Sequence, residues 1–363
     1  MARIIFHVPN KLMENMKSAS HIRPFKMIEA FKELGYDVDL VMGDVAERKA
    51  KIKEIKENIV NGVRYDFMYS ESSTMPTLLT ESHHLPLNPF LDFGFMKYIK
   101  SKGIKIGLFY RDIHWKFPLY KKNVKGIKYH LAILMYKYDL RKYEEILDIL
   151  YLPNLKMKKY LPKSLDDYCK ELPPGMEIIG QDNKEIKELR LIYVGGLGDL
   201  YNISEFVKAV NSTENIYLTI CCRENEWEKN KNLYSPFLNE RIKIVHLSGE
   251  DLKEEYKNSN IGVLTLKPSD YLDFAVPYKL YEYMGHSLPI ISTDHTASAD
   301  IVRNYDIGFV IDNFEKDYKE LFEELKNSPQ LLNDKKENIR KIQNENTWLA
   351  RAKQVANELK EGE

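Results

Sequence analysis

Residues Asp273 to Ser292 read DFAVPYKLYEYMGHSLPIIS, and this stretch is the most informative about the fold of the second half of the chain. Pro277 suits the first turn of a helix, because the N–H group that proline lacks has no helical partner there. Good helix formers follow until Gly285, and Pro289 then opens a short apolar run. The stretch therefore predicts a short helix followed by a buried strand.

Glu282 lies five residues beyond Pro277, about a turn and a half into the predicted helix. A helix that starts at a cleft offers free N–H groups and the positive end of its dipole to a phosphate. A carboxylate at the position of Glu282 can then accept hydrogen bonds from two ribose hydroxyls. The alternative is a surface helix with a solvated Glu282, and spacing alone does not decide between the two.

The rest of the chain alternates short apolar runs with longer helical patterns, which is typical of parallel sheets with crossover helices. Two groups of runs predict two doubly wound, Rossmann-like sheets, an α/β architecture. The predicted strands cover residues 4–8, 38–42, 67–70, 106–110 and 149–152, and then 191–194, 217–221, 242–245, 261–264, 288–292 and 309–311.

A length of 363 residues also favours two domains. The proline- and glycine-containing stretch 172–189 predicts the linker. We expect a first domain over residues 1–178, a second over 179–340, and a C-terminal helix over 341–363 that crosses back to the first. Charge supports this division: residues 1–180 hold 30 Lys and Arg against 22 Asp and Glu, and residues 181–363 hold 24 against 32. A basic first half suits an anionic partner, although such scatter is also common.

The composition, 44% hydrophobic and 30% charged, excludes global disorder. The three cysteines, Cys169, Cys221 and Cys222, show neither metal-binding spacing nor an even count, which favours reduced thiols in the cytoplasm. The N-terminus shows no signal-peptide pattern, and no apolar run reaches transmembrane length. We expect a cytoplasmic protein.

The pattern from Pro277 to Met284, followed by Leu288-Pro289-Ile290-Ile291, resembles the donor-binding signature of glycosyltransferase family 4 and its relatives. The resemblance extends downstream to Ile307–Val310 and upstream to Leu191–Gly198, so it covers the whole second half. It implies the GT-B fold, in which two Rossmann-like domains face a central cleft. It further implies transfer from a nucleoside diphosphate sugar with retention of configuration, and no metal or other cofactor.

The resemblance assigns ribose binding to Glu282. The predicted donor site comprises Gly195, Gly196, Arg223, Pro277, Tyr278, Lys279 and Glu282. Two positions depart from the family. Phe274 stands where many members carry a second glutamate near the transferred sugar, and Gly196 stands where they carry a diphosphate-binding arginine. Some other cation must then stabilise the leaving diphosphate, and Arg223 and Lys279 are the candidates.

In the first half, an apolar strand runs directly into Arg111, Asp112, His114 and Trp115. The resemblance places a histidine or aspartate of this region near the donor sugar, so we predict Asp112 and His114 at the reaction centre. Predicted acceptor contacts are Arg23, Glu71, Arg111 and Trp115. The alternative is that Arg111 and Asp112 form a local ion pair and that Trp115 belongs to the core. We place Arg23 in a loop, residues 20–24, before a helix over residues 25–34.

Residues 97–142 are basic and aromatic, with twelve Lys and Arg between residues 100 and 142 against only Asp112 and Asp139. The apolar section 127–138 predicts an interfacial helix pressed onto an anionic membrane, at the inner face of the cytoplasmic membrane. A buried helix with a basic approach loop is the alternative. No RNA-binding module accompanies these residues, so we expect no nucleic-acid partner.

The function that follows is a hexosyltransferase that uses a nucleotide sugar, with UDP as the expected nucleotide. The expected acceptor is a glycan or lipid-linked hydroxyl in polysaccharide, glycolipid or glycoprotein assembly. Two alternatives share the fold: a catalytically inactive accessory subunit and a nucleotide-sugar epimerase. A nicotinamide dehydrogenase is disfavoured, because the spaced glycine fingerprint is absent.

Overall fold

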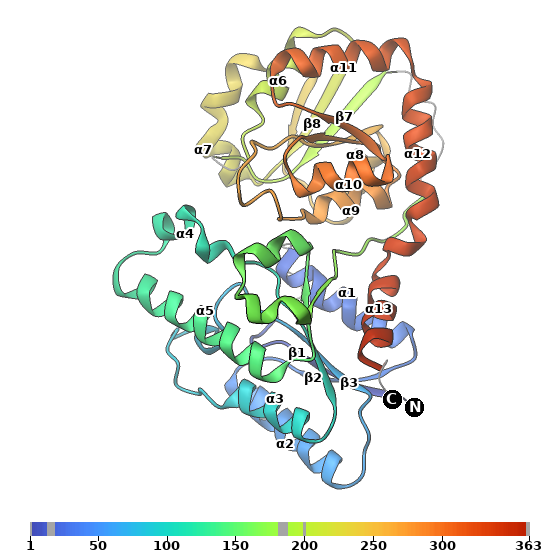
Figure 1. Ribbon diagram of the computed structural model, residues 1–363. Helices are drawn as coiled ribbons and strands as arrows, with labels where there is room; N and C mark the ends of the chain where they lie inside the picture. Colours follow the sequence, from blue (N-terminus) through green and yellow to red (C-terminus); the bar gives the residue numbers. More distant parts are fainter. Residues whose placement is uncertain (1, 13–18, 181–187, 199–200, 361–363) are drawn as a thin grey trace. The chain divides into compact units, whose positions relative to one another are not determined.

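The computed structural model describes residues 2–12, 19–180, 188–198 and 201–360. The chain forms two compact units, which are shown in Figure 1. Unit 1 comprises Met1–Pro174 together with Trp348–Glu363, and unit 2 comprises Gly175–Thr347. Part of the predicted linker, residues 181–187, lies outside the described residues.

Unit 1 contains a six-stranded parallel sheet in the order β2-β1-β3-β4-β5-β6. Its strands are β1 (Arg3–His7), β2 (Asp37–Val41), β3 (Phe67–Glu71), β4 (Lys105–Phe109), β5 (Ile149–Leu152) and β6 (Cys169–Glu171). Its α-helices are α1 (Ala19–Glu33), α2 (Val45–Val60), α3 (Leu91–Ser101), α4 (Pro118–Asn123), α5 (Gly126–Ile146) and α13 (Trp348–Lys360). The central strands are nearly continuous apolar runs, because helices cover both faces of a parallel sheet.

Unit 2 contains a second six-stranded parallel sheet, in the order β12-β11-β10-β7-β8-β9. Its strands are β7 (Leu189–Val194), β8 (Ile216–Cys221), β9 (Ile242–Val245), β10 (Ile261–Leu264), β11 (Ile290–Thr293) and β12 (Gly308–Ile311). Its α-helices are α6 (Ser204–Ser212), α7 (Glu224–Tyr234), α8 (Glu250–Lys257), α9 (Tyr278–Gly285), α10 (Ala297–Tyr305), α11 (Glu315–Asn327) and α12 (Gln330–Ile342).

The predicted α/β class with two doubly wound sheets is confirmed. Three local predictions need correction. The short strand β6 was not predicted, and residues 20–24 belong to α1 rather than to a loop before it. Pro277 precedes α9 as its N-cap, with extended backbone angles, so the first helical residue is Tyr278.

Each sheet reverses its strand order at one point, and ligands of doubly wound folds bind at the carboxyl ends of the strands there. In unit 2 the reversal falls between β7 and β10. The loop after β7 and the segment that leads from β10 into α9 both start at this edge. In unit 1 the reversal falls between β1 and β3. The strand order therefore indicates which loops can form a ligand-binding site, namely those at the reversal point of each sheet.

The helix α13 returns from unit 2 to unit 1, where it packs against α1, β3 and β4. Its buried face presents Ala352, Val355, Ala356 and Leu359. Gly107 in β4 allows this approach, since an added Cβ would lie 3.0 Å from Leu359 Cδ1. No helix among the described residues is long and apolar enough to cross a membrane.

A buried polar chain joins the elements of unit 1. The His7 ring contacts Ser70 Oγ at 2.8 Å through Nδ1 and Asp92 Oδ1 at 3.0 Å through Nε2. Arg48 pairs with the same carboxylate at 3.1 Å. These side chains are at most 3% exposed. The Ser–His–Asp arrangement therefore ties β1, β3, α2 and α3 together and cannot meet a substrate.

Candidate functional site

The predicted ribose-binding Glu282 lies on α9 at the reversal edge of unit 2. Its carboxylate pairs with Lys279, one turn earlier, and the charge of Glu282 helps to raise the pKa of the buried Tyr256 of α8, after burial itself. Lys279 Nζ lies 3.5 Å from the Tyr256 hydroxyl oxygen. The Glu282 and Lys279 side chains remain 21% and 29% exposed, so a ligand can reach them. Lys279 is thus engaged beside the expected ribose position.

Tyr283 fixes α9 against the sheet. Its hydroxyl accepts the Val194 N–H at 2.9 Å and donates to the Val263 carbonyl at 3.3 Å. These residues belong to β7 and β10, the two strands between which the order reverses. Gly262 makes room for the ring, because an added Cβ there would lie 2.5 Å from Tyr283 Cγ. The start of α9 is consequently held at the reversal edge.

Side-chain and backbone hydrogen bonds fix the glycine-rich loop that follows β7. Tyr193 donates its hydroxyl to the Gly196 carbonyl at 2.7 Å, and Gly195 donates its N–H to the Cys221 carbonyl at 3.1 Å. Glu226 of α7 accepts the Leu197 N–H at 3.1 Å. A glycine suits position 196, where an added Cβ would lie 3.1 Å from the Glu226 carboxylate.

Arg223, the candidate diphosphate-binding cation, is the N-cap of α7, and its side chain is 71% exposed. Its Nη1 pairs with Glu226 Oε1 at 3.2 Å. The same carboxylate therefore contacts both Arg223 and the glycine-rich loop, which brings these two predicted elements together. Such an exposed ion pair is weak and leaves the guanidinium free to reorient.

Cys221 lies near Glu282, and Phe274 precedes α9 in the sequence. Cys221, at the end of β8, donates its thiol to the Leu247 carbonyl at 3.3 Å, and burial raises the pKa of this thiol. The charges of Lys279 and Glu282 also act on this thiol, so Leu247 and the loop after β9 lie near the same edge. Phe274 is 1% exposed and packs edge-on against Tyr271 at 5.4 Å, so its ring supports the segment before α9 from within.

In unit 1, Arg23, Glu71 and Arg111 come together where β3 ends. Arg23 Nε lies 3.2 Å from Glu71 Oε1, and Arg111 Nη2 lies 3.2 Å from Glu71 Oε2. Tyr69 also donates to Glu71 Oε1, at 3.1 Å. Glu71 is completely buried, and burial lowers the pKa of Arg111. Glu71 therefore holds two guanidinium groups in place, and its own carboxylate is enclosed by protein.

Asp112 and His114 lie side by side after β4. Asp112 Oδ1 accepts the His114 N–H at 3.0 Å, and the other carboxylate oxygen lies 3.4 Å from His114 Nδ1. Their side chains are 22% and 30% exposed. A carboxylate that orients a partly exposed imidazole is an arrangement suited to accepting a proton. Arg111 pairs with Glu71, and the charge of Asp112 also acts on its guanidinium group.

Trp115 lies in the core, as in the alternative that the sequence left open. Its ring is 4% exposed and stacks on Tyr136 at 5.0 Å and 6°. Its indole N–H donates to the Tyr110 hydroxyl at 2.9 Å. The Tyr136 ring therefore covers one face of Trp115, and the Tyr110 hydroxyl engages its N–H group.

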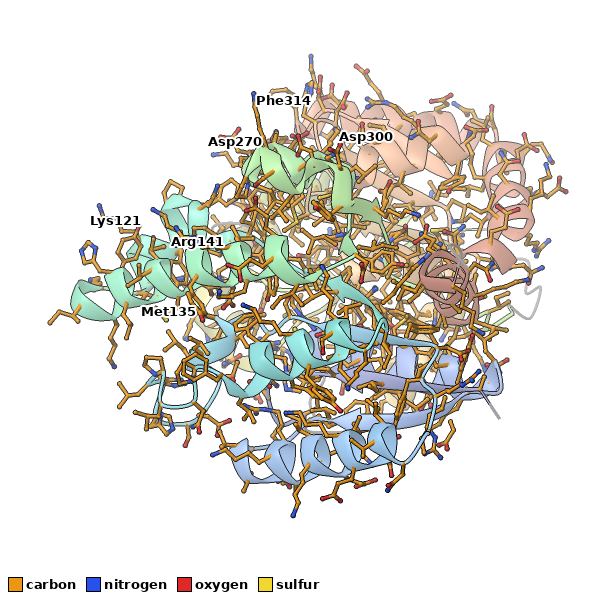
Figure 2. The ribbon with its side chains drawn as sticks, turned by 60° about the horizontal axis from the view of Figure 1, so that its bottom comes forward. Lys121, Met135, Arg141, Asp270, Asp300 and Phe314 are labelled. Carbon is orange, nitrogen blue, oxygen red and sulfur yellow. The ribbon has the colours of Figure 1, made fainter. Side chains whose placement is uncertain are left out.

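The basic segment carries exposed charges beside exposed apolar side chains. Lys121, Lys125 and Lys128 are exposed, as are Ile127 at 86% and Leu134 at 60%. Figure 2 shows Lys121, Met135 and Arg141 along α4 and α5. The other face of α5 is buried, through residues that include Ala132, Tyr136, Asp139, Leu140, Tyr143 and Ile146. The helix is therefore amphipathic, with one face in the core and the other at the surface.

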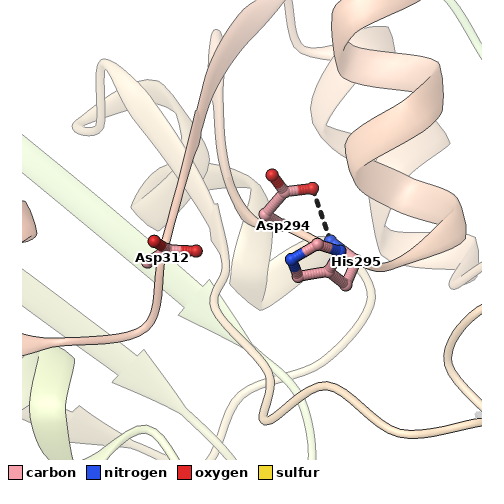
Figure 3. A group of neighbouring side chains, drawn as sticks. All are labelled: Asp294, His295 and Asp312. Atoms are coloured by element: carbon pink, nitrogen blue, oxygen red, sulfur yellow. Dashed lines mark hydrogen bonds between the residues drawn. The ribbon is translucent and has the colours of Figure 1, made fainter.

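Asp294, His295 and Asp312 form a group that could hold a metal ion by geometry, with ligand atoms within 4.8 Å of one another (Figure 3). They follow the paired strands β11 and β12. The Asp294 carboxylate is already engaged by Arg303 and by the His295 N–H. His295 and Asp312 are exposed, and exposed groups of this kind are common without an ion. We assign no role to this group.

Two residues that touch the predicted donor site were not predicted, namely Tyr256 and Glu226. Tyr256 stands in EDLKEEYK, where the surrounding charges indicate only a surface helix. Glu226 is one of several acids in RENEWEK. A tyrosine at the buried spacing of a helix that follows a β-strand was the available signal for Tyr256.

Two doubly wound parallel sheets in one chain, each with one reversal of strand order, form the GT-B fold. Residues 176–342, which span most of unit 2, match the family described as "Glycosyl transferases group 1". No curated protein matches the sequence significantly.

Solved structures of the same fold cover nearly the whole chain. The sucrose-phosphate synthase of Thermosynechococcus elongatus is 13% identical, with a TM-score of 0.64 and 98% of both chains covered. HepE of Anabaena, in complex with UDP-glucose, is 10% identical, with a TM-score of 0.64 and 99% of both chains covered. WaaG, a glycosyltransferase involved in lipopolysaccharide biosynthesis, is 13% identical, with a TM-score of 0.58 over 99% of this chain and 100% of WaaG. At these identities the similarity establishes the fold.

Proposed function

We propose that this protein is a glycosyltransferase that transfers a hexose from a UDP-sugar to a hydroxyl acceptor, with retention of configuration. The observation that carries the proposal is the Glu282 carboxylate, which is partly exposed at the reversal edge of unit 2 and paired with Lys279. A carboxylate with open acceptor positions suits a ribose diol. The similar fold of HepE, whose structure contains UDP-glucose, supports UDP as the nucleotide.

The leaving diphosphate requires positive charge, since charge develops on it in the transition state. Arg223 and the start of α9 supply that charge in our proposal, and Gly195 and Gly196 let the backbone approach the phosphates. The acceptor attacks from the face that the diphosphate leaves, so no enzymatic nucleophile is needed. Asp112 and His114 would take the proton of the acceptor hydroxyl. We propose that the reaction requires no divalent metal ion, so the activity should persist when EDTA is added.

We further propose a glycan or lipid-linked acceptor presented at an anionic membrane surface. The exposed lysines of α4 and α5, together with Ile127 and Leu134, support this proposal. Arg23 and Arg111 share one buried carboxylate at the end of β3. Two guanidinium groups side by side suit a phosphate-bearing acceptor.

The test is to incubate the protein with a panel of UDP-, GDP-, ADP- and CDP-sugars and to measure both thermal shift and nucleotide release. A shift with UDP-sugars, followed by UDP release when a lipid-linked acceptor is added, supports the proposal. The anomeric configuration of the product, read by NMR, decides whether configuration is retained. Absence of any shift would favour the inactive accessory subunit, and conversion of the donor without acceptor would favour the epimerase.

Glu282→Ala should weaken UDP binding by about tenfold or more, because a carboxylate hydrogen bond contributes about 1.5–3 kcal/mol. Titration calorimetry on the purified variant measures the change. Glu324→Ala, at an exposed position of α11, is the matched control for loss of an acidic side chain in unit 2. Unchanged UDP affinity in Glu282→Ala would remove the ribose assignment.

A further inference from the structure

The carboxylate of Glu226, on α7, contacts both of the features to which we assign the donor diphosphate. Glu226 Oε1 pairs with Arg223 Nη1 at 3.2 Å, and Glu226 Oε2 accepts the Leu197 N–H of the glycine-rich loop at 3.1 Å. Phosphate oxygens form the same two kinds of hydrogen bond, with guanidinium groups and with the N–H groups of glycine-rich loops. Glu226 therefore makes, within the protein, the contacts that a phosphate group would make.

The glycine-rich loop does not need the charge of this carboxylate. Asn230 Nδ2 donates to the Leu197 carbonyl at 3.1 Å, and Tyr193 donates its hydroxyl to the Gly196 carbonyl at 2.7 Å. The Leu197 N–H requires only an acceptor oxygen, which a neutral amide also offers. The negative charge of Glu226 consequently matters for Arg223.

The pair between Arg223 and Glu226 is suited to being exchanged. The Arg223 side chain is 71% exposed and that of Glu226 is 25% exposed, and an exposed ion pair changes an equilibrium constant by about fivefold at most. A diphosphate carries more negative charge than one carboxylate and can accept two parallel hydrogen bonds from a guanidinium group. Arg223 can therefore leave Glu226 for a diphosphate, at the cost of this pair.

We propose that Glu226 is an internal competitor of the donor diphosphate for Arg223. The diphosphate binds the guanidinium group in place of Glu226 when the nucleotide enters, and Glu226 pairs with Arg223 again when the UDP product leaves. This inference rests on the proposed function and adds a control of product release at the same site. Product release limits the turnover of many enzymes, so a weaker hold on UDP can raise the rate.

The experiment measures the binding of UDP and of uridine by titration calorimetry on the full chain. Glu226→Gln keeps an acceptor oxygen for the Leu197 N–H but loses the charge that pairs with Arg223. UDP affinity should rise about threefold to fivefold, the upper range for one exposed ion pair. Uridine has no phosphate, so its affinity should change less than about twofold. Dissociation of UDP, followed by stopped flow, should slow by about the same factor as the affinity rises.

Glu228→Gln is the matched control on the same helix. Glu228 lies two residues further along α7, on the other side of the helix, and pairs with Lys231 at 2.6 Å. Its change should leave the affinities for both ligands unaltered. Glu226→Gln is also made in an Arg223→Gln background, where the gain in UDP affinity should disappear because the two residues act as a pair.

UDP affinity in a folded Glu226→Gln no higher than that of the wild type would overturn the inference. An equal gain for uridine, or the same gain without Arg223, would also overturn it, because the effect would then not pass through the guanidinium group and the phosphates. Failure of the wild-type protein to bind UDP would instead overturn the proposed function.

Discussion

At the scale of single residues, burial changes what a polar side chain can do. Glu71 and Trp115 stand in a sequence context that suggests substrate binding, but both are buried and fully engaged. Glu282 and His114 keep a fifth to a third of their surface exposed. The chemistry available to each residue type was readable from the sequence. The exposure of each side chain could not be read from the sequence, because the residues that bury it come from distant segments of the chain.

Asp139 gives a prediction at this scale. It is 3% exposed on α5, and it accepts the Thr77 N–H at 2.7 Å. Burial raises the pKa of its carboxyl to about 7. Because the pKa in the folded state lies above that of the unfolded chain, the contribution of Asp139 to stability is full below about pH 4 and is lost as pH rises to about 7.

Asp139→Asn, which is neutral and can still accept from Thr77, should remove this loss. The difference in unfolding free energy, variant minus wild type, should rise by roughly 2–4 kcal/mol between about pH 4 and 7. Above about pH 7 this difference should stay constant. Urea titrations at pH 5, 6, 7 and 8 measure the difference. A difference that does not depend on pH would show that Asp139 ionises normally.

At the scale of elements, the strands were the easiest features to predict. Each central strand is a short apolar run, and burial on both faces requires that pattern. The strand β6 was missed because its sequence, Cys-Lys-Glu, is short and polar, as an edge strand can be. The start of α1 was missed because Pro24 suggested a helix boundary, whereas it lies inside the helix. The contact between α8 and α9 through Tyr256 depends on tertiary packing, which no local pattern reveals.

The helices α4 and α5 give a prediction at this scale. Changing Lys121, Lys125 and Lys128 to glutamate should weaken binding to anionic vesicles by at least a hundredfold, because each lysine near such a surface contributes about 1 kcal/mol. Flotation with phosphatidylcholine vesicles, with and without phosphatidylglycerol, measures binding. The matched control changes Lys49 and Lys53, which are exposed on α2. Equal binding to neutral and anionic vesicles would contradict the proposed membrane surface.

At the scale of the whole molecule, two units share one chain, and unit 1 is built from both of its ends. The expectation of two Rossmann-like sheets followed from the alternation of strands and helices. The unit boundary lies at Pro174 and Gly175, and the chain returns to unit 1 at Trp348. The identity of the acceptor was beyond prediction, because the residues that would select it lie in unit 1, outside the family match.

Removal of residues 348–363 should selectively destabilise unit 1, because it exposes the apolar surfaces of α1, β3 and β4 that α13 covers. Differential scanning calorimetry should show a lower-temperature or absent transition for unit 1, while a transition for unit 2 persists and still shifts with UDP. Alanine substitution at the exposed position Lys353 is the control. A single unchanged transition would show that α13 contributes little.

The return of α13 also sets an order of events during synthesis. Unit 2 is one continuous segment, so the ribosome delivers all of it before the last helix of unit 1 is made. Domains tend to fold as units while the chain emerges. Most of unit 1 is synthesised first, but the surface that α13 covers stays exposed until unit 2 has been synthesised. Unit 2 can then be complete before unit 1.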